Sequence, residues 1–251
     1  HLSIRRQRQM CIRDRCTLDS MLGLASIELS SGDFLLQCFA SRDELCAELE
    51  RLRPAEVLLE SASPFAELNF NTQTQADWHF VYESAHRTLT EQFNTRDLAG
   101  FGCQNLPAAV CAAGALLQYV KDTQRKALPH LTRLRIQQQQ DYIVVDAVSR
   151  HNLEIDQAID GNKKVCLTGV IDHTKTSMGA RCLRRWLGQP SLDFSVIEQR
   201  YQAIDDLIQH QLYPELMNGL ANISDIERIR GRIAIQTCLL YTSPSPRDLS
   251  T

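Results

Sequence analysis

The chain has 251 residues, 43% of them hydrophobic and 23% charged, and a formal net charge of −3. This length is typical of one or two domains, and the apolar content is sufficient for a buried core. A domain that holds DNA phosphates by itself needs clustered Lys and Arg, and this sequence has no basic stripe. No apolar run approaches the roughly 18 residues that a membrane-spanning helix requires. Composition therefore argues against independent DNA binding and against a membrane span.

The two ends of the chain differ in character from the segment between them. Residues 5–15 are rich in arginine, and residues 238–248 are rich in serine and proline. One codon choice for residues 9–15 has a reverse complement that encodes Cys-Leu-Leu-Tyr-Thr-Ser, the sequence of residues 238–243. This relation is typical of translated adaptor DNA from a sequencing library, so we expect residues 1–15 and 238–251 to be non-native and exclude them from fold predictions. The alternative is a basic N-terminal arm with a Ser/Pro tail. Without both ends the net charge falls to −7, because they contain six arginines and two aspartates.

Cysteine usage in the body favours a reducing compartment. No pair has Cys-x-x-Cys spacing, and no histidine pair has zinc-finger spacing. We expect reduced thiols in a cytosolic protein, with neither a metal site nor a redox site. The residues concerned are Cys16, Cys38, Cys46, Cys103, Cys111, Cys166 and Cys182.

The first half of the body alternates short apolar runs with amphipathic segments. Two runs joined by Ser-Gly-Asp predict a β-hairpin over residues 22–39. Ser41 and Glu44 have the spacing of a capping box at the start of a helix. Strands are also predicted at Glu56–Glu60 and His79–Tyr82, and helices at Ser84–Phe93 and Leu106–Gln124. This order of elements is typical of a layered α/β domain.

The second half is mainly helical. Pro129 ends the long helix and marks the predicted domain boundary. The β-branched run Tyr142–Val145 predicts a buried strand, and Asp146 after it is a helix N-cap candidate. Further helices are predicted from Thr176 or Ser177 to Pro190, and over Asp193–Gln209, Leu212–Leu220 and Ile226–Ile235.

Two blocks of this half form one long pattern. The first is Asp146-x-x-Ser149-x-x-Asn152-Leu153-Glu154-Ile155, and the second is Ile171-Asp172-x-Thr174-x-Thr176-x-Met178-Gly179-x-Arg181-x-Leu183-Arg184-x-Trp186-Leu187-x-x-Pro190. The pattern resembles the start of the core (lever) domain of the MutS family of DNA mismatch-repair proteins. Departures are small, with Ile171 where Leu is usual and His173 where a small residue or Cys is usual.

The first half resembles the connector domain of the same family. The similar segments are Leu29–Phe34, Pro54–Glu56, Phe93–Gly102, Ala112–Gln124 and Leu128–Leu131. The resemblance implies an α/β connector with RNase H-like topology over residues 16–128. It also implies the truncated start of a mainly α-helical lever domain over residues 129–237.

The resemblance further implies the setting in which this segment works. The parent protein would bind mismatched duplex DNA as a homodimer in the bacterial cytoplasm, hydrolyse ATP with Mg²⁺ at a distant C-terminal site, and recruit MutL. This sequence contains neither a Gly-x-x-x-x-Gly-Lys-[Ser/Thr] loop nor the family's Gly-x-Phe-Tyr-Glu mismatch wedge. We therefore expect no catalytic, cofactor-binding or metal-binding residues here, and a mechanical role that couples distant sites.

A few charged residues are candidates for that coupling role. Arg181 and Asp172 are a possible structural pair that locks the connector–core joint, whereas Arg184 and Arg185 are expected to be solvated. The exposed, polar helix at Glu83–Gln92 is a candidate MutL surface, with Arg87 and Glu91 as its test residues.

Three other functions remain open from the sequence. A MutS paralogue outside mismatch repair would share both domains, and a stand-alone interaction module would lack further domains. An RNase H-like nuclease is the third, but it needs several converging carboxylates for two metal ions. The first strand offers only Glu28, with Asp33 beyond the turn.

Overall fold

The computed structural model of the chain describes residues 8–13, 21–61, 63–67, 69–124 and 128–234. The chain forms two compact units. The sheet unit contains residues 1–40, 54–136 and 227–251, and the helical unit contains residues 41–53 and 137–226. Cys16, Ile235 and most of the two ends predicted to be adaptor-derived lie outside the described residues.

The sheet unit is built on a mixed β-sheet. In the described part of the chain its strands are β1 (Arg8–Arg13), β2 (Leu22–Glu28), β3 (Asp33–Phe39), β4 (Glu56–Glu60), β5 (Thr72–Gln75) and β6 (Arg135–Ile136). Their spatial order is β5-β4-β1-β2-β3-β6. Strand β2 runs antiparallel to β1 and β3, whereas β1–β4, β4–β5 and β3–β6 are parallel pairs. The predicted hairpin and the strand at Glu56–Glu60 are confirmed.

Strand β1 lies in a segment that the sequence analysis excluded from the fold. It fills the position between β2 and β4 and pairs with both. Strand pairing uses backbone N–H and C=O groups, which every non-proline residue carries. An arginine-rich segment can therefore complete a sheet, and the adaptor origin of residues 1–15 stays a prediction.

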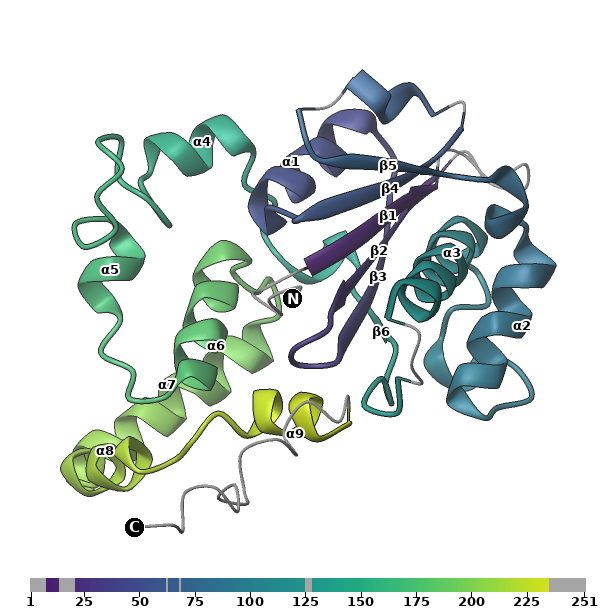
Figure 1. Ribbon diagram of the computed structural model, residues 1–251. Coiled ribbons are helices and arrows are strands. Elements are labelled where there is room, and N and C mark those ends of the chain that lie inside the picture. The colour runs from purple at the N-terminus through teal and green to yellow at the C-terminus, as the bar shows by residue number, and fades with distance from the viewer. Residues whose placement is uncertain (1–7, 14–20, 62, 68, 125–127, 235–251) are drawn as a thin grey trace, which may run out of the picture. The chain divides into compact units, whose positions relative to one another are not determined.

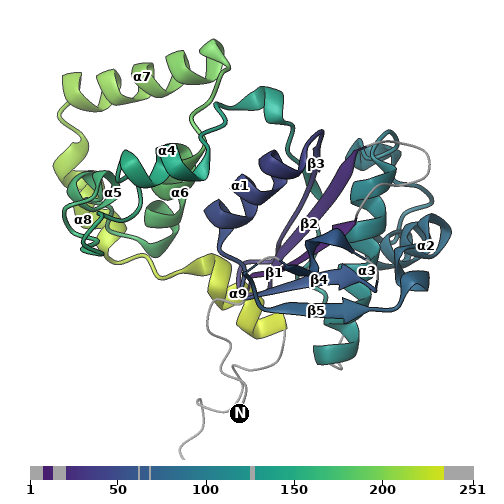
Figure 2. The same ribbon diagram turned by 90° about the horizontal axis from the view of Figure 1, so that it is seen from above.

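Two helices cover one face of this sheet. Helix α3 (Pro107–Gln124) packs on β1, β2 and β3, and helix α2 (Tyr82–Phe93) packs on α3. Figures 1 and 2 show this layering, with α2 on the far side of α3 from the strands. Small residues allow close approach, because a Cβ atom on Gly23 would lie 2.2 Å from the Ala108 backbone carbon. The buried core of the unit lies between the strands and α3 and includes Ile27, Phe34, Leu36, Leu58, Val110, Leu116, Leu117 and Val120.

Two predictions in this unit differ from the structure. Residues 79–82 are not a strand, because Asp77–Phe80 form a 3-10 turn and α2 already begins at Tyr82. Phe80 is nonetheless fully buried, so its apolar character marks packing and not strand pairing. Conversely, residues 61–76 were predicted from their polar character to be a loop with at most a helical turn, but Thr72–Gln75 form strand β5 at the edge of the sheet, paired on one side with β4.

The helical unit contains short helices separated by capped turns. Its helices are α1 (Arg42–Leu52), α4 (Ala147–Asn152), α5 (Leu167–Ile171), α6 (Ser177–Gly188), α7 (Phe194–Gln209) and α8 (Tyr213–Ala221). Helix α9 (Ile226–Ala234) follows and belongs, from Glu227 onward, to the sheet unit. The predicted capping box is present, since the Ser41 hydroxyl accepts from Glu44 N and the Glu44 carboxylate accepts from Ser41 N.

The predicted buried strand at Tyr142–Val145 is wrong. Tyr142 makes an isolated β-bridge to Ser191, while Ile143 and Val144 have exposed fractions of 47% and 49%. The start of this segment is instead bonded to the chain just after α6. Ile143 N donates to Pro190 O, and Leu192 N donates to Asp141 O.

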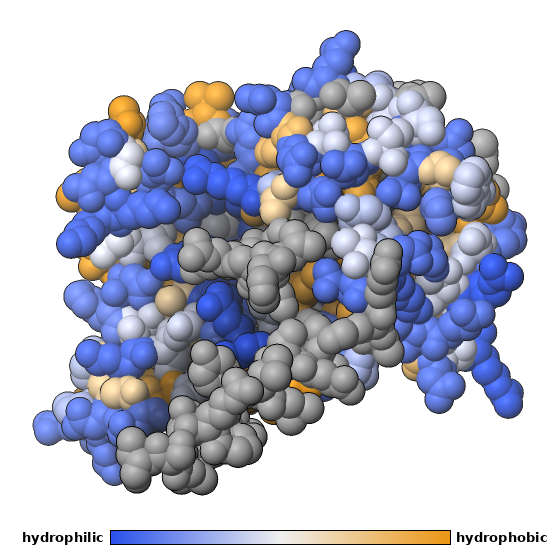
Figure 3. Space-filling model, in the orientation of Figure 1, coloured by the Kyte–Doolittle hydropathy of each residue, from blue (hydrophilic) through white to orange (hydrophobic). Residues whose placement is uncertain are grey.

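The helical unit exposes many apolar side chains, including Val148, Ile159, Val170, Phe194, Tyr201 and Ile208. Figure 3 shows orange apolar spots over α4 and α5, separated by blue polar side chains. In the residues that the structure describes, none of the helices combines the length and apolar character needed to cross a membrane.

Candidate functional site

The helical unit buries charged side chains where α1 meets the segment that begins at α4. Glu48 on α1 is only 6% exposed, and its two carboxylate oxygens accept from Nε and Nη2 of Arg51, each at 2.6 Å. Arg51 is itself 13% exposed. Such a bidentate pair fixes the direction of both side chains, because the planar guanidinium matches the carboxylate.

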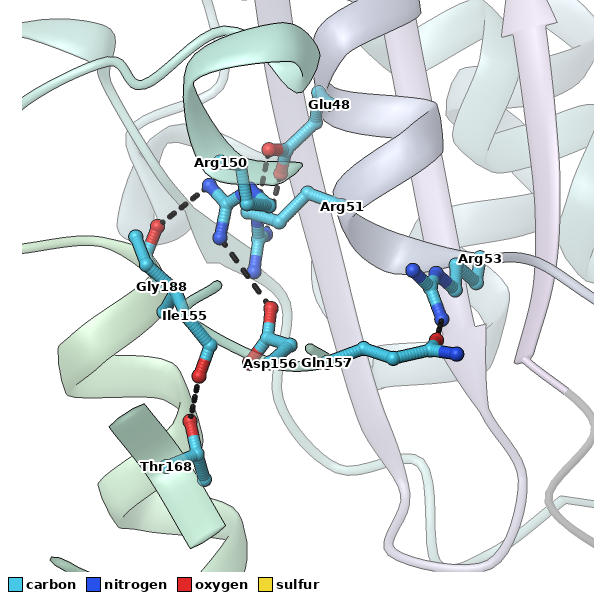
Figure 4. A network of polar contacts seen from close by, with 9 residues as sticks. All are labelled: Glu48, Arg51, Arg53, Arg150, Ile155, Asp156, Gln157, Thr168 and Gly188. Carbon is cyan, nitrogen blue, oxygen red and sulfur yellow. Dashed lines mark hydrogen bonds and ion pairs between the residues drawn. The ribbon is translucent and has the colours of Figure 1, made fainter. Parts of the chain in front are cut away.

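Arg150 of α4 points into the same cluster, as Figure 4 shows. Its Nη2 donates to the Gly188 carbonyl at 2.9 Å, and its Nη1 lies 3.6 Å from Asp156 Oδ2. Burial lowers the pKa of Arg150, and the adjacent Arg51 cation acts in the same direction. The carboxylates of Asp156 and Glu48 oppose this shift. The cluster thus places two cations and two anions together in a poorly solvated setting.

The hydrogen bonding of Arg150 is incomplete. Among the described residues, neither its Nε nor its Nη1 has a hydrogen-bond partner, although both atoms are buried. A buried ion pair stabilises only where geometry and surrounding hydrogen bonds offset the loss of hydration. The arrangement is therefore better suited to fixing how α1 lies on α4 than to adding much stability.

A second polar contact joins the end of α1 to the same segment. Arg53 ends the helix in a left-handed conformation, with φ 45°, and its Nη1 donates to Gln157 Oε1 at 3.3 Å. Gln157 thus bonds directly to the end of α1, whereas Arg150 lies near enough to Arg51 and Glu48 of α1 for their charges to act on it (Figure 4).

The first block of the sequence pattern builds the scaffold of this cluster. Asp146 caps α4 by accepting from Ser149 N, which orients Arg150 in the first turns. Glu154 then adopts a left-handed conformation, with φ 49°, that reverses the chain. The Ile155 carbonyl accepts from both N and Oγ1 of Thr168, at 2.9 and 2.7 Å. These bonds hold the chain directly before Asp156 and so help to place its carboxylate.

The second block organises the start of α6. Asp172 accepts from N and Oγ1 of Thr174, and Thr176 caps α6 by accepting from Gly179 N. Gly179 is packed closely, because a Cβ atom there would lie 3.1 Å from Thr176 Oγ1. Asp172, Thr174 and Thr176 therefore form a turn and cap a helix. These structural roles account for the spacing of the three residues, and no catalytic role is needed to explain it.

The predicted pair of Arg181 with Asp172 has the wrong partner. Arg181 forms a bidentate pair with Asp225 instead, with N–O distances of 2.7 and 2.8 Å, and both side chains are largely buried. Asp172 turns toward Thr174 and lies 3.5 Å from the half-exposed Arg184. The arginine that approaches Asp172 is Arg184, which lies three residues, or nearly one turn, further along α6. Arg181 connects α6 to the start of α9 rather than to the joint with α1.

The remaining candidates are surface residues. Arg87 and Glu91 lie on α2 and are exposed, as predicted for a partner surface. Arg185 is exposed and contacts Cys182, and Trp186 is covered by the Arg200 guanidinium at 3.8 Å from its ring centroid.

The carboxylates weighed for metal-dependent hydrolysis have other contacts. Glu28 Oε1 accepts from Ser30 Oγ at 3.2 Å, and Asp33 pairs with Arg135 at 2.7 Å. In the described part of the chain, no group of three or more His, Cys, Asp and Glu side chains could hold a metal ion.

Sequence reasoning missed the residues that matter most to the α1–α4 cluster. Glu48, Arg51 and Asp156 look like ordinary solvated charges, since charged residues on short helices are mostly exposed. A usable signal was present on α1, where Glu48 lies one residue from Leu49 and three from Leu45, within the apolar face.

Comparison with protein families accounts for both halves of the chain. Residues 9–132 match MutS domain II, and residues 148–251 match MutS domain III. Helix α1 therefore lies inside the domain II match although it packs in the helical unit, whereas α4 lies at the start of the domain III match. The charge cluster is thus a joint between these two family domains. The chain belongs to the MutS family and carries its domain II (connector) and domain III (core), which indicates a role in DNA mismatch repair.

Proposed function

We propose that this chain is the coupling segment of a bacterial, cytoplasmic MutS-type mismatch-recognition protein. It transmits the DNA-binding state to a distant ATPase, which uses ATP and Mg²⁺, and it helps to receive MutL. The parent protein binds mismatched duplex DNA as a homodimer. This chain contributes the mechanical link and does not itself carry out the ATPase reaction.

One observation carries the proposal. A helix of domain II, α1, packs in the same compact unit as the first part of domain III, where its buried Glu48 lies near the buried Arg150 of α4 and Arg150 pairs with the part-exposed Asp156. Buried charges tolerate few alternative arrangements, because an unpaired charge in a poorly solvated site is costly. A displacement of domain III would therefore move α1 with it, or break the cluster as a whole.

The sheet supports an RNase H-like assignment for domain II. Its first five strands lie in the order β3-β2-β1-β4-β5, and β2 is antiparallel to its neighbours. Fold alone does not imply chemistry, since unrelated functions recur on one architecture. The ion pair of Asp33 with Arg135 favours a structural sheet over a nuclease site.

A chimaera tests the coupling role. The matching parts of domains II and III of an active bacterial MutS would be replaced by residues 21–234 of this chain, with the host's own strand in place of β1 and the rest of the host's domain III kept. Arg150→Met and the half-exposed control Arg184→Met would then be compared. We expect Arg150→Met to bind mismatched DNA within about twofold of the parent chimaera but to slow ATP-triggered release about tenfold, because the joint no longer transmits the change.

Equal release rates in the two variants would refute the coupling role. The unmodified chimaera also separates mismatch repair from a paralogue function, by its effect on the mutation rate of a MutS-deficient strain. Restored repair supports the proposal, whereas a folded chimaera that binds mismatches and leaves the mutation rate high favours a paralogue.

The MutL surface is tested separately with the purified chain. The double charge reversal Arg87→Glu, Glu91→Lys changes exposed positions of α2, so folding should be unaffected. We expect MutL binding, measured by biolayer interferometry, to weaken about tenfold. Glu198→Lys on the exposed side of α7 is the control, and unchanged MutL affinity in the double variant would remove α2 from the interface.

A further inference from the structure

Like α1, helix α9 belongs to one family domain but packs in the compact unit formed mainly by the other. It lies within the domain III match, yet from Glu227 it belongs to the sheet unit formed mainly by domain II. Among its contacts there is the β2–β3 turn, Leu29–Gly32, beside which it lies in Figure 1. We infer that α9 is a releasable strap by which domain III holds the β2–β3 turn of domain II.

The strap approaches the turn backbone to backbone. Gly231 is buried, and a Cβ atom on it would lie 2.5 Å from the Ser30 carbonyl oxygen. No other residue fits at that distance without moving the helix or the turn. Beside it, Arg230 Nη2 donates to the Ser31 carbonyl at 3.3 Å. The glycine therefore sets the distance of closest approach, and the arginine sets the position along the turn.

The β2–β3 turn is itself stabilised by hydrogen bonds. Glu28 O accepts from Ser31 N and Gly32 N, and Gly32 adopts a left-handed conformation with φ 76°. On its inner side the buried His130 bonds to the Leu29 carbonyl at 3.1 Å. The carbonyls of Leu29, Ser30 and Ser31 are thus contacted in succession, the first by His130 and the other two by α9.

Helix α9 buries few apolar side chains compared with the core elements. Ile226 and Ile233 are both 61% exposed, and Ile229 is only partly buried. Apolar burial is the main source of a helix's tertiary stability, and elements with little of it open first. Helix α9 can therefore leave the turn while β2, β3 and α3 stay folded.

Hydrogen exchange followed by mass spectrometry on the full chain tests the strap. Gly231→Ala introduces the clash with Ser30, whereas Gly219→Ala on α8 places a methyl group in open space and is the matched control. We expect Gly231→Ala to raise exchange of α9 and of the β2–β3 turn about tenfold, with α3 unchanged. Arg230→Ala should raise exchange at the same two places about threefold.

Equal exchange of α9 in the two glycine variants would overturn the strap. Should Gly231→Ala fail to fold, Arg230→Ala decides, and unchanged exchange of α9 and the turn in that variant would overturn it as well. The strap's role in transmission rests on the proposed function, but its docking is measured without DNA or nucleotide. A chimaera that shows no coupling while α9 responds as expected would leave the strap standing and remove the coupling role.

Discussion

At the scale of single residues, two arginines of domain III show how the same side chain serves two kinds of contact. Arg150 is buried with incomplete hydrogen bonding beside Asp156, whereas Arg181 has a bidentate, well-aligned partner in Asp225. Aligned bidentate bonds to a carboxylate are among the stronger polar contacts in proteins. Arg181 should therefore contribute pairwise stability, and Arg150 should mainly fix an arrangement.

A double-mutant cycle tests the corrected pairing of Arg181. We expect Arg181→Met and Asp225→Leu to show a coupling free energy of about 1–3 kcal/mol in urea unfolding, because the two side chains share two short bonds. The cycle of Arg181→Met with Asp172→Leu is the control and should show about zero. A larger coupling with Asp172 than with Asp225 would restore the original pairing.

His130 is a further buried ionisable residue. A carbonyl only accepts, so Nε2 donates to Leu29 O, and in the neutral ring the buried Nδ1 then carries no proton. In the described part of the chain this Nδ1 has no hydrogen-bond partner. Burial lowers the pKa of His130, and the Arg230 cation lowers it further.

This depressed pKa predicts a loss of stability in mild acid. The unfolded chain takes up a proton at the ordinary histidine pKa of about 6.5, whereas the folded chain resists it. Stability is therefore fully present above that pH and falls as the pH drops below it, by at most about 1.4 kcal/mol per pH unit. Urea midpoints between pH 7.5 and 5 measure this, and His130→Gln should flatten the decline. The same slope in His130→Gln as in the exposed control His151→Gln would contradict the assignment.

At the scale of elements, close contacts through glycine decide how the helices pack. Gly114 on α3 faces Ala85 on α2, where an added Cβ atom would lie 2.3 Å from the Ala85 Cα atom. This approach lets α2 lie directly against α3 and is one reason why both helices share one face of the sheet.

Gly114→Ala should destabilise the sheet unit by about 1–3 kcal/mol, because the two helix backbones must separate. The measurement is the urea midpoint of the full chain, with Gly100→Ala as the control because its added methyl group meets nothing within 4 Å. Equal midpoints for the two variants would show that the α2–α3 contact is more compliant than its geometry indicates.

Elements with local signals were predictable from the sequence. Ser41 with Glu44, Asp146 and Thr176 each announce a helix start by a side chain that satisfies free backbone N–H groups, and all three caps are present. Two strand predictions failed because β-branched or aromatic residues were taken as strand formers without knowledge of their tertiary partners. Strand β5 was missed for the opposite reason, since an edge strand of Thr and Gln needs no apolar face.

The candidate site was less predictable, because it depends on burial. The family pattern marked Asp146 and Ile155, and Arg150 falls at one of its variable positions. Nothing local showed that Glu48, about a hundred residues earlier, would share the environment of Arg150. Pairing between distant charges follows from the fold and leaves no periodic trace in the sequence. The same reason explains the mistaken partner of Arg181.

At the scale of the whole molecule, the family domains and the compact units do not coincide. Domain II contributes α1 to the helical unit, and domain III contributes most of α9 to the sheet unit. Each contribution is fixed by a different device, a buried charge cluster for α1 and a glycine contact for α9. In the proposed function, these two exchanged helices are the parts through which a change in one domain reaches the other.

The most direct test of this account is hydrogen exchange of α1 in the full chain. Arg150→Met removes the buried cation of α4 that lies near Arg51 and Glu48 of α1, and Arg184→Met removes a half-exposed cation of the same unit. The account predicts that exchange of the amides of Arg42–Leu52 rises about tenfold or more in Arg150→Met and is unchanged in Arg184→Met. Unchanged protection of α1 in Arg150→Met, with the variant otherwise folded, would contradict it.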